Sequence, residues 1–283
     1  QAEDGIRDRS PSRGLGDVYK RQLQEVGGMR LILIGCEYSG GTTMALAIGD
    51  WILKEFSASG VRIHDHWVYP DISDQDPTKC FILGPGAVIP EEGRYAHLGS
   101  DYGSEKLTEE RAADVRALKP WILEQAQRIM VWRHMHPSNI TRDVFKGEVL
   151  RDSIEVGLHY PEAVYAPMYY GYGESGSFSD RRQRVREWDR ALLEVAPEYV
   201  LVLLRSSSQA IRERMLSNPR PGHIPRENDV EKVIGLFEEQ YDESELNQKL
   251  VIQTSGVSVE ESVAEFVRKV EPFLTDEDRR RRG

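Results

Sequence analysis

The sequence predicts an α/β protein with a three-layer α/β/α, doubly wound fold around a mainly parallel, five-stranded sheet. From Met29 onward, short apolar runs alternate with longer amphipathic stretches, which is typical of strands joined by helical crossovers. The apolar runs at residues 31–34 and 199–204 are continuous, as strands covered on both faces require. A glycine-rich turn at residues 35–41 separates the first strand from the first helix.

The expected elements follow one another in the order that such a fold requires. Strands are expected at residues 31–34, 61–65, 148–158, 199–204 and 250–252. Helices are expected at residues 42–57, 104–118, 120–135, 161–170, 180–195, 207–217 and 229–246. A terminal helix is expected after Ser258, because Ser258 and Glu261 form a capping-box pattern. Residues 78–104 are rich in Gly and Pro, and we expect them to be irregular.

Composition limits the classes of protein and partner. The chain has 283 residues, of which 39% are hydrophobic, enough for one large α/β domain. The sequence has no run of about 18 apolar residues, so we expect no membrane-spanning helix and no membrane partner. The two cysteines, Cys36 and Cys80, carry no metal-ligand or disulfide pattern, so a reducing cytoplasm is expected. The formal charge of −10 argues against binding a nucleic-acid polymer and favours a small ligand.

Both ends of the chain are set apart from the predicted domain. Residues 1–22 resemble the in-frame translation of a transposase adapter from sequencing libraries, clearest at residues 17–22 (DVYKRQ). We therefore expect residues 1–28 to be a non-native or disordered leader. The domain is expected at residues 29–273, and residues 274–283 read as a charged, solvated and frayed tail.

Residues 35–43 (GCEYSGGTT) match most of a phosphate-binding loop. The P-loop pattern is Gly, four residues, then Gly-Lys-Ser/Thr between a strand and a helix. Its backbone amides turn toward the anion, and the helix N-terminus adds about half a positive charge. We expect ATP as the cofactor, with Mg²⁺ on the Thr42 hydroxyl. The expected cofactor-binding residues are Gly35, Tyr38, Ser39, Gly40, Gly41, Thr42 and Thr43.

Gly41 stands where the pattern has its lysine. The substitution removes the positive charge that normally reaches the β and γ phosphates. The competing interpretation is a glycine-rich strand-to-helix turn without a ligand.

Arginines follow the strongest expected strand. Arg205 comes directly after the apolar run, so topology places it near the carboxyl ends of the strands, where ligands bind in such sheets. Arg212 and Arg214 lie on different faces of the next helix. Residues 218–228, rich in Pro and carrying Arg220 and Arg226, read as a mobile lid. The expected catalytic arginines are Arg205, Arg212, Arg220 and Arg226; the alternative is that the helical ones make surface ion pairs.

Together these segments resemble the thymidylate kinase and deoxynucleoside kinase branch of P-loop kinases. The resemblance is carried by the Ser39-to-Thr43 loop, the run LLRSSSQAIRERM from Leu203, the Pro/Arg segment and the FEEQY helix from Phe237. The final strand and helix, from Ile252 to Glu261, are also similar. In that branch the Pro/Arg segment is the lid that brings arginines onto the transferred phosphate.

The resemblance also implies a site for a small-molecule acceptor. Residues 159–171 (HYPEAVYAPMYYG) are similar to the segment that lines the acceptor nucleoside pocket. The expected substrate-contacting residues are His66, His159, Glu162, Tyr165 and Tyr169. Tyr165 and Tyr169 are four residues apart, and core packing is the better explanation for these two. The chain departs from the branch by lacking the lysine and by ending its third strand Gly157-Leu-His159 where the branch has an acidic-Arg pair.

Asp65 follows the second strand between His64 and His66. A carboxylate at the carboxyl end of a strand is a candidate base for a substrate proton, or a ligand of Mg²⁺ through water. A polar strand end without a function is the alternative. A zinc site at the two histidines would need further ligands, and no suitable spacing supplies them.

The leading functional hypothesis is an ATP-dependent kinase for a small nucleoside- or nucleotide-like acceptor, with a homodimer among the open oligomeric states. A second hypothesis is a sulfotransferase-like enzyme, because the Ser-Gly-x-Thr-Thr loop also resembles the phosphosulfate loop of sulfotransferases. Those proteins have a lysine where this chain has Tyr38, and a Ser where it has Glu213, eight positions after Arg205. The third hypothesis is a non-catalytic nucleotide-binding module, which agrees with Gly41.

Overall fold

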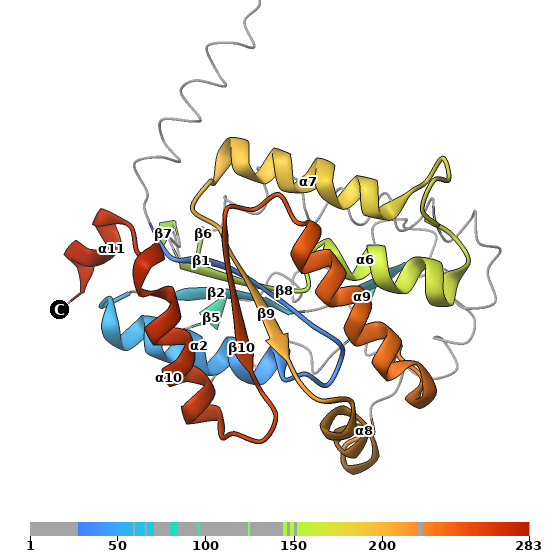
Figure 1. Ribbon diagram of the computed structural model, residues 1–283. Helices are drawn as coiled ribbons and strands as arrows, with labels where there is room; N and C mark the ends of the chain where they lie inside the picture. The colour runs from blue at the N-terminus through green and yellow to red at the C-terminus, as the bar shows by residue number, and fades with distance from the viewer. Residues whose placement is uncertain are drawn as a thin grey trace, which may run out of the picture.

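The computed structural model describes residues 28–58, 60–65, 67–70, 80–83, 95–96, 124, 144–145, 148–149, 152–219 and 223–282. In these residues a central sheet is covered by helices on both faces (Figure 1). The predicted three-layer fold is therefore confirmed.

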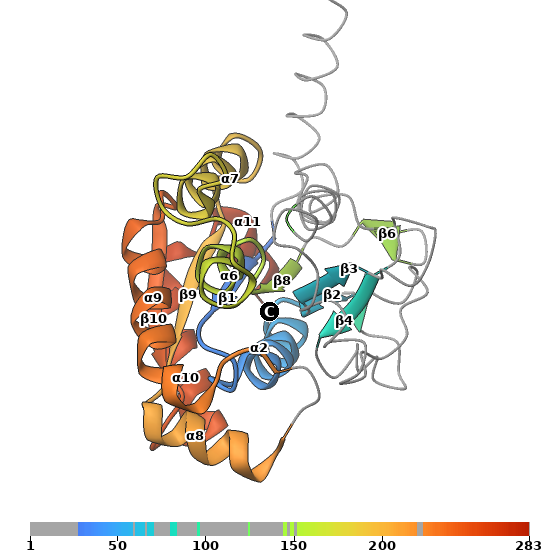
Figure 2. The same ribbon diagram turned by 90° about the vertical axis from the view of Figure 1, so that its right-hand side faces the viewer.

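The central sheet has six strands, all paired in parallel, in the order β10-β9-β1-β8-β2-β5. In Figure 2 the strands run from β10 and β9 on the left to β8 and β2 on the right. Five of them are the predicted strands, and the two-residue β5 is an addition. The strands are β1 (Arg30–Ile34), β2 (Val61–Asp65), β5 (Tyr95–Ala96), β8 (Asp152–Val156), β9 (Val200–Arg205) and β10 (Gln248–Gln253).

The two faces of the sheet carry alternate residues of each strand, because successive side chains of a strand point to opposite faces. Ile32 and Ile34 pack on one face with α6 (Tyr160–Tyr165), α7 (Arg181–Val195) and α9 (Val230–Glu243). Leu31 and Leu33 pack on the other face with α2 (Gly41–Glu55) and α10 (Val259–Val270). Figure 1 shows these two groups of helices on opposite sides of the sheet.

The helices around the second half of the sheet agree with the sequence. The helix α8 (Ser208–Ser217) follows β9, and η3 (Glu227–Asp229) leads into α9. The predicted capping box at Ser258 and Glu261 opens α10. The predicted helix at residues 161–170 is present, but its second half, η2 (Ala166–Tyr170), is a π-helix. The helices expected at residues 104–135 lie outside the described residues, apart from Glu124, which is helical.

Short strands occur where the sequence analysis did not place them. The strand expected at residues 148–158 is divided, because β7 (Glu148–Val149) pairs with β6 (Val144–Phe145) in a separate antiparallel ladder and β8 begins at Asp152. A second ladder joins β3 (Trp67–Pro70) to β4 (Cys80–Leu83), which falls in the segment expected to be irregular.

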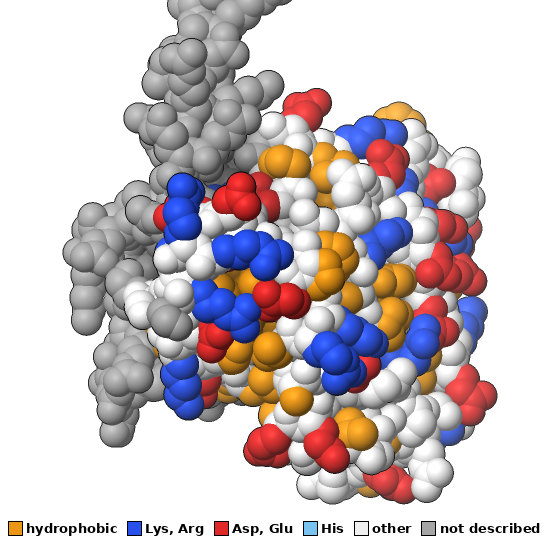
Figure 3. Space-filling model, turned by 60° about the vertical axis from the view of Figure 1, so that its left-hand side comes forward, with side chains coloured by type: hydrophobic (Ala, Val, Ile, Leu, Met, Phe, Trp, Pro, Cys, Tyr) orange, Lys and Arg blue, Asp and Glu red, His pale blue; other side chains and the backbone are white. Residues whose placement is uncertain are grey.

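The carboxyl end is ordered, although the sequence suggested a frayed tail. After η4 (Glu271–Phe273), Thr275 caps α11 (Asp276–Arg281) through a capping box with Asp278. Arg281 pairs with Asp152 at the start of β8, and Asp152 is 2% exposed. The face of the molecule in Figure 3 carries basic and acidic side chains next to one another. Paired charges, which composition alone does not predict, hold this end.

Within the described residues, no helix has both the length and the apolar character needed to cross a bilayer.

Candidate functional site

The candidate site lies at the carboxyl end of β1. This strand lies between β9 and β8, so the strands that follow it along the chain are placed on both sides of it. Parallel α/β sheets bind ligands at such a switch point, outside the carboxyl ends of the strands. The loop of residues 35–40 connects β1 to α2 at this position.

The loop turns back on itself through one internal hydrogen bond, and the backbone amides of residues 40–43 have no acceptor within the helix. The Ser39 amide donates to the Cys36 carbonyl over 2.9 Å, and helical bonding begins with the Met44 amide donating to Gly40. Tyr38 and Gly40 have φ of 67° and 100°, and such a conformation costs a non-glycine residue about 1 kcal/mol or more. The four amides of residues 40–43 point ahead of the first helical turn, as at any helix N-terminus.

Gly35 is required by the packing of the loop. A Cβ on Gly35 would lie 2.7 Å from Ser39 Oγ and 2.8 Å from the Leu204 carbonyl oxygen of β9. A larger residue would therefore push the loop away from the sheet. Burial raises the pKa of the neighbouring Cys36 thiol well above its usual range, and the nearby Glu37 raises it further. Cys36 is accordingly an inert, packed side chain.

The amino terminus of α2 has no side-chain cap and no acidic residue in its first turn. By contrast, side chains of Asp180, Ser207, Ser258 and Thr275 cap α7, α8, α10 and α11. Among the described residues, the hydroxyls of Thr42 and Thr43 have no hydrogen-bond partner either. An open helix N-terminus of this kind is a ready anion site.

Gly41, at the lysine position, packs directly against β8. It is the first residue of α2, and its φ is not in the left-handed region. A Cβ on Gly41 would nevertheless lie 2.9 Å from Val156 Cγ1, closer than carbon atoms approach in proteins. The neighbouring strand, and not the backbone conformation, therefore excludes a side chain here.

A pocket of about 330 Å³ opens in front of this helix N-terminus. Residues 38–44 line it, and so do Thr254 and Val257 in the loop between β10 and α10. Ser217 and Asn218, at the end of α8, also line it. The pocket therefore extends from a phosphate-type loop to a half-apolar wall, since Val257 is 43% exposed.

Arg214 joins two parts of the pocket lining, Tyr38 and Thr254. Its Nη1 donates to the Tyr38 carbonyl over 2.8 Å and to Ser206 Oγ over 3.3 Å, and its Nη2 donates to the Thr254 carbonyl. Burial lowers its pKa below the usual arginine value, but arginine stays charged in proteins. Arg214 is thus a cation fixed beside the loop.

The far end of the expected lid also touches the loop. The Ile224 amide donates to Glu37 Oε2 over 2.9 Å, and the His223 ring meets the Tyr38 ring edge-on at 6.3 Å between centroids. Arg226 lies over the Tyr169 ring, with 5.6 Å from Cζ to the centroid. These contacts place residues 223–226 against the phosphate loop, while Arg220 lies outside the described residues.

The other expected catalytic arginines make ion pairs near the surface. Arg205, at the end of β9, pairs through Nε with Glu238 at 2.9 Å. Arg212 pairs with Glu231 at 3.3 Å and donates to the Glu227 carbonyl. Neither lines the pocket, whereas Arg214, two residues along α8, does.

Of the expected acceptor residues, Tyr165 contacts the loop and Tyr169 contacts Arg226 of the expected lid. The Tyr165 hydroxyl accepts from the Glu37 amide over 3.2 Å, and burial raises its pKa well above the usual value. Tyr169 donates to Asp229 over 3.3 Å, and burial raises its pKa to about 12. Glu162 is buried with Tyr172 and Arg181 beside it. Tyr165 packs against Phe237 as core, as expected.

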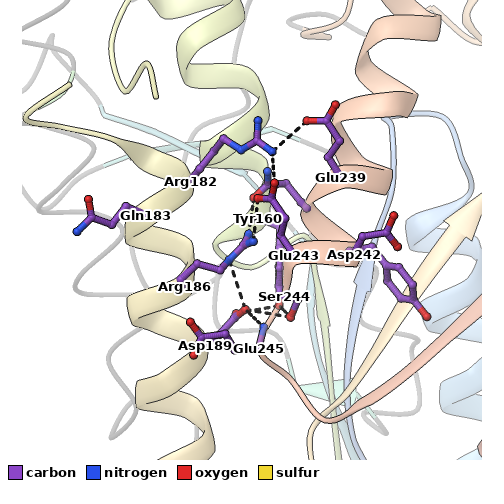
Figure 4. Close-up of polar contacts among 12 residues, drawn as sticks. Tyr160, Arg182, Gln183, Arg186, Asp189, Glu239, Asp242, Glu243, Ser244 and Glu245 are labelled. Carbon is purple, nitrogen blue, oxygen red and sulfur yellow. Dashed lines mark hydrogen bonds and ion pairs between the residues drawn. The ribbon is translucent and has the colours of Figure 1, made fainter. Parts of the chain in front are cut away.

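His159, which was expected to contact the substrate, is buried in the interior. Its Nε2 lies 2.7 Å from Asp189 Oδ1, and Asp189 also accepts from Tyr160, Ser244 and the Glu245 amide. Figure 4 shows Asp189 with Tyr160, Ser244 and Glu245, together with Arg182 and Arg186 of α7. The Asp65 side chain and all of His66 lie outside what the structure describes.

The residues present fit a nucleotide phosphate better than a protein-held metal. No group of three or more His, Cys, Asp or Glu side chains in the described part is arranged to hold a metal ion. The free Thr42 hydroxyl, at the start of α2, is suited to share Mg²⁺ with phosphate oxygens, because Mg²⁺ is usually held by few protein ligands together with substrate phosphates.

Sequence reasoning did not select two important side chains. Arg214 was seen but not chosen over Arg212, because helix phase alone does not say which face meets the loop. Asp189 was missed, although a signal exists: Val185, Asp189 and Leu192 share one buried helical face. A carboxylate on an apolar stripe indicates a buried polar network.

Comparison with solved structures finds nucleotide kinases among the similar proteins. Thymidylate kinase from Candida albicans superposes with a TM-score of 0.46 at 13% identity, covering 87% of this chain and 92% of that chain. Deoxyadenosine kinase from M. mycoides gives 0.46 at 12%, covering 86% and 100%. Thymidylate kinase from Ehrlichia chaffeensis gives 0.40 at 12%, covering 86% and 98%. No family model and no curated protein matches the chain.

The chain has a P-loop NTPase fold. The position of β1 between β8 and β9 and the loop that joins it to α2 carry this assignment.

Proposed function

We propose that this protein binds a nucleotide on residues 35–43 and transfers a phosphoryl group from ATP to a small nucleoside- or nucleotide-like acceptor. The observation that carries the proposal is the uncapped start of α2, which faces a pocket of about 330 Å³. Both the size of the pocket and its chemistry suit a nucleotide.

The phosphates would lie against the loop. Amides of residues 40–43 donate to them, the α2 dipole favours their charge, and Arg214 adds a cation at the Tyr38 side. When bound, Mg²⁺ would neutralise phosphate charge beside the Thr42 hydroxyl.

The nucleoside would occupy the opposite end of the pocket. Val257 and Val259, 43% and 38% exposed, offer apolar surface to the flat face of a base. The hydroxyls on this wall are already engaged: Thr254 donates to the Arg205 carbonyl, and Ser262 donates to the Gln253 carbonyl. The Asn218 side chain stays available for the edge of the base.

Transfer requires a second set of groups on the lid side of the loop. A bond forms between an acceptor oxygen and the terminal phosphorus as the bond to the β-phosphate oxygen breaks, and the acceptor proton passes to a base. Asp65 is the candidate base by its place at the carboxyl end of β2. Arg220 and Arg226 are the candidate lid cations, and Glu162 with Tyr169 would contact the acceptor.

A non-catalytic nucleotide-binding module is the second candidate. It is favoured by the contact between Gly41 and Val156, because this contact leaves the loop without space for the lysine of active P-loops. Tight ATP binding with no turnover across a panel of nucleoside and nucleotide acceptors would select this candidate.

Isothermal titration of the full chain with ATP, with and without Mg²⁺, tests the proposal. We expect saturable ATP binding that Mg²⁺ strengthens, and a T42A variant that loses the Mg²⁺ effect while T43A retains it. Binding of adenosine 3′,5′-bisphosphate without binding of ATP would contradict the proposal and favour sulfuryl transfer. Absence of binding by both ligands would mean that the loop is a turn without a ligand.

A further inference from the structure

The packing between Gly41 and Val156 bears on which part of a nucleotide the loop recognises. In a P-loop, backbone amides cradle the α and β phosphates, whereas the lysine reaches the β and γ phosphates. Here the amides of residues 40–43 are in place, but the lysine position holds a glycine. This chain therefore keeps the amides that cradle the α and β phosphates and lacks the lysine that reaches the β and γ phosphates.

Val156 cannot easily make way for a side chain at Gly41. Its backbone is held in the sheet by pairing with Leu33 on one side and Asp65 on the other. Its side chain packs against the core cluster beneath α2. A β-branched side chain has few rotamers, so the 2.9 Å approach of a Gly41 Cβ to Cγ1 would be relieved by moving the loop.

The described cations of β9 and α8 do not replace the lysine, and Arg226 lies over the Tyr169 ring. Of the described residues that line the pocket, Arg214 is the one cation. Its guanidinium is engaged by the Tyr38 and Thr254 carbonyls and by Ser206. Arg205 and Arg212 are paired with Glu238 and Glu231. A third phosphate would add negative charge without a new partner on the loop.

We propose that the pocket recognises the diphosphate part of a nucleotide and gains no affinity from a third phosphate. The inference rests on the proposed function, since it names which nucleotides the same site prefers. A nucleoside diphosphate binds at least as tightly as the triphosphate, and a nucleoside monophosphate binds more weakly than both. Gly41 and Val156 act as a matched pair that sets this preference.

Titration of the wild-type protein with AMP, ADP and ATP at one salt concentration gives the first test. We expect the Kd of ADP to be the lower limit for the Kd of ATP, and AMP to bind about tenfold more weakly than ADP. A lower Kd for ATP than this limit, or equal binding of AMP and ADP, would overturn the inference. If none of the three binds, the proposed function itself fails.

Variants at the matched pair give the second test. G41K should weaken ADP binding and lower Tm, because the new Cβ meets Val156. G41K/V156A should recover ADP binding and favour ATP over ADP by about tenfold, while V156A alone keeps the wild-type ratio of Kd values. Gain of ATP affinity in G41K without a loss of Tm would overturn the role of Val156. If the double variant does not fold, the wild-type titration still decides the inference.

Discussion

Arg214 Nη1 donates to the Tyr38 carbonyl oxygen over 2.8 Å, across 176 positions of sequence. The bond ties α8 to a loop residue whose φ is 67°. The same guanidinium donates to the Thr254 carbonyl, which also lines the pocket. Arg214 therefore ties the loop after β1 to the segment after β10 beside the pocket.

R214A should weaken ATP binding by about tenfold or more. The change removes a cation beside the phosphates and leaves the Tyr38 and Thr254 carbonyls without a buried donor, at a cost of about 1–3 kcal/mol. R212A is the matched control, because Arg212 lies on the same helix and pairs with the exposed Glu231. Titration calorimetry measures both Kd values. Equal Kd values for the two variants would contradict the role given to Arg214.

D189A should lower the free energy of unfolding by about 3 kcal/mol or more. Asp189 is 0% exposed and accepts hydrogen bonds from His159, Tyr160 and Ser244, and each buried donor left without a partner costs about 1–3 kcal/mol. E187Q is the control on the same helix, since Glu187 pairs with the exposed Arg184. Urea unfolding followed by circular dichroism gives both values. A loss below 1 kcal/mol in D189A, by this same scale, would mean that the network is dispensable.

Stability should fall with acid, and Asp189 should account for part of the fall. Burial by itself raises the pKa of Asp189, but hydrogen bonds from His159 and Tyr160 outweigh it, so the folded-state pKa is lowered. A lowered folded pKa means that the contribution is complete above the unfolded value of about 4 and is lost as pH falls through the folded value. Urea midpoints between pH 7 and pH 3 should therefore decrease. D189N should have a shallower decrease over the acid part of this range, and an identical profile would refute the assignment.

The adjacent arginines of α11 should differ in their contribution to stability. Arg281 donates to the buried Asp152 over 3.1 Å, whereas Arg280 pairs with Glu277 near the surface. Removal of a partner from a buried ion pair costs about 3–5 kcal/mol, and an exposed pair contributes about 0–1 kcal/mol. Thermal unfolding should show a clear loss of Tm in R281A and little change in R280A. Similar Tm values would show that α11 does not hold the start of β8.

The sequence predicted those parts of the fold that depend on strong local patterns. The apolar runs of β1 and β9 and the Ser258 capping box each identify their element without tertiary information. The short strand β5 and the order of α11 depend instead on long-range pairing. Arg281 has a structural role because the chain returns to Asp152, and no pattern within residues 274–283 indicates this contact.

The sequence predicted the loop of the candidate site. It did not predict which residues from other strands and helices line the pocket. The spacing of Gly35, Gly40 and Thr42 predicted the turn between β1 and α2 because the pattern lies within one short segment. Arg214 and Val257 reach the pocket through the register of β9 and β10, which the sequence does not state. The obstruction by Val156 could not be predicted either, since it depends on the distance between the start of α2 and the end of β8.

If ATP phosphates bind at the uncapped start of α2, amide hydrogen exchange with and without ATP will locate them there. We expect slower exchange at the amides of residues 40–43 on addition of ATP, together with protection in the segment that contains Thr254. Saturable ATP binding with protection elsewhere and unchanged exchange at residues 40–43 would contradict binding at this position.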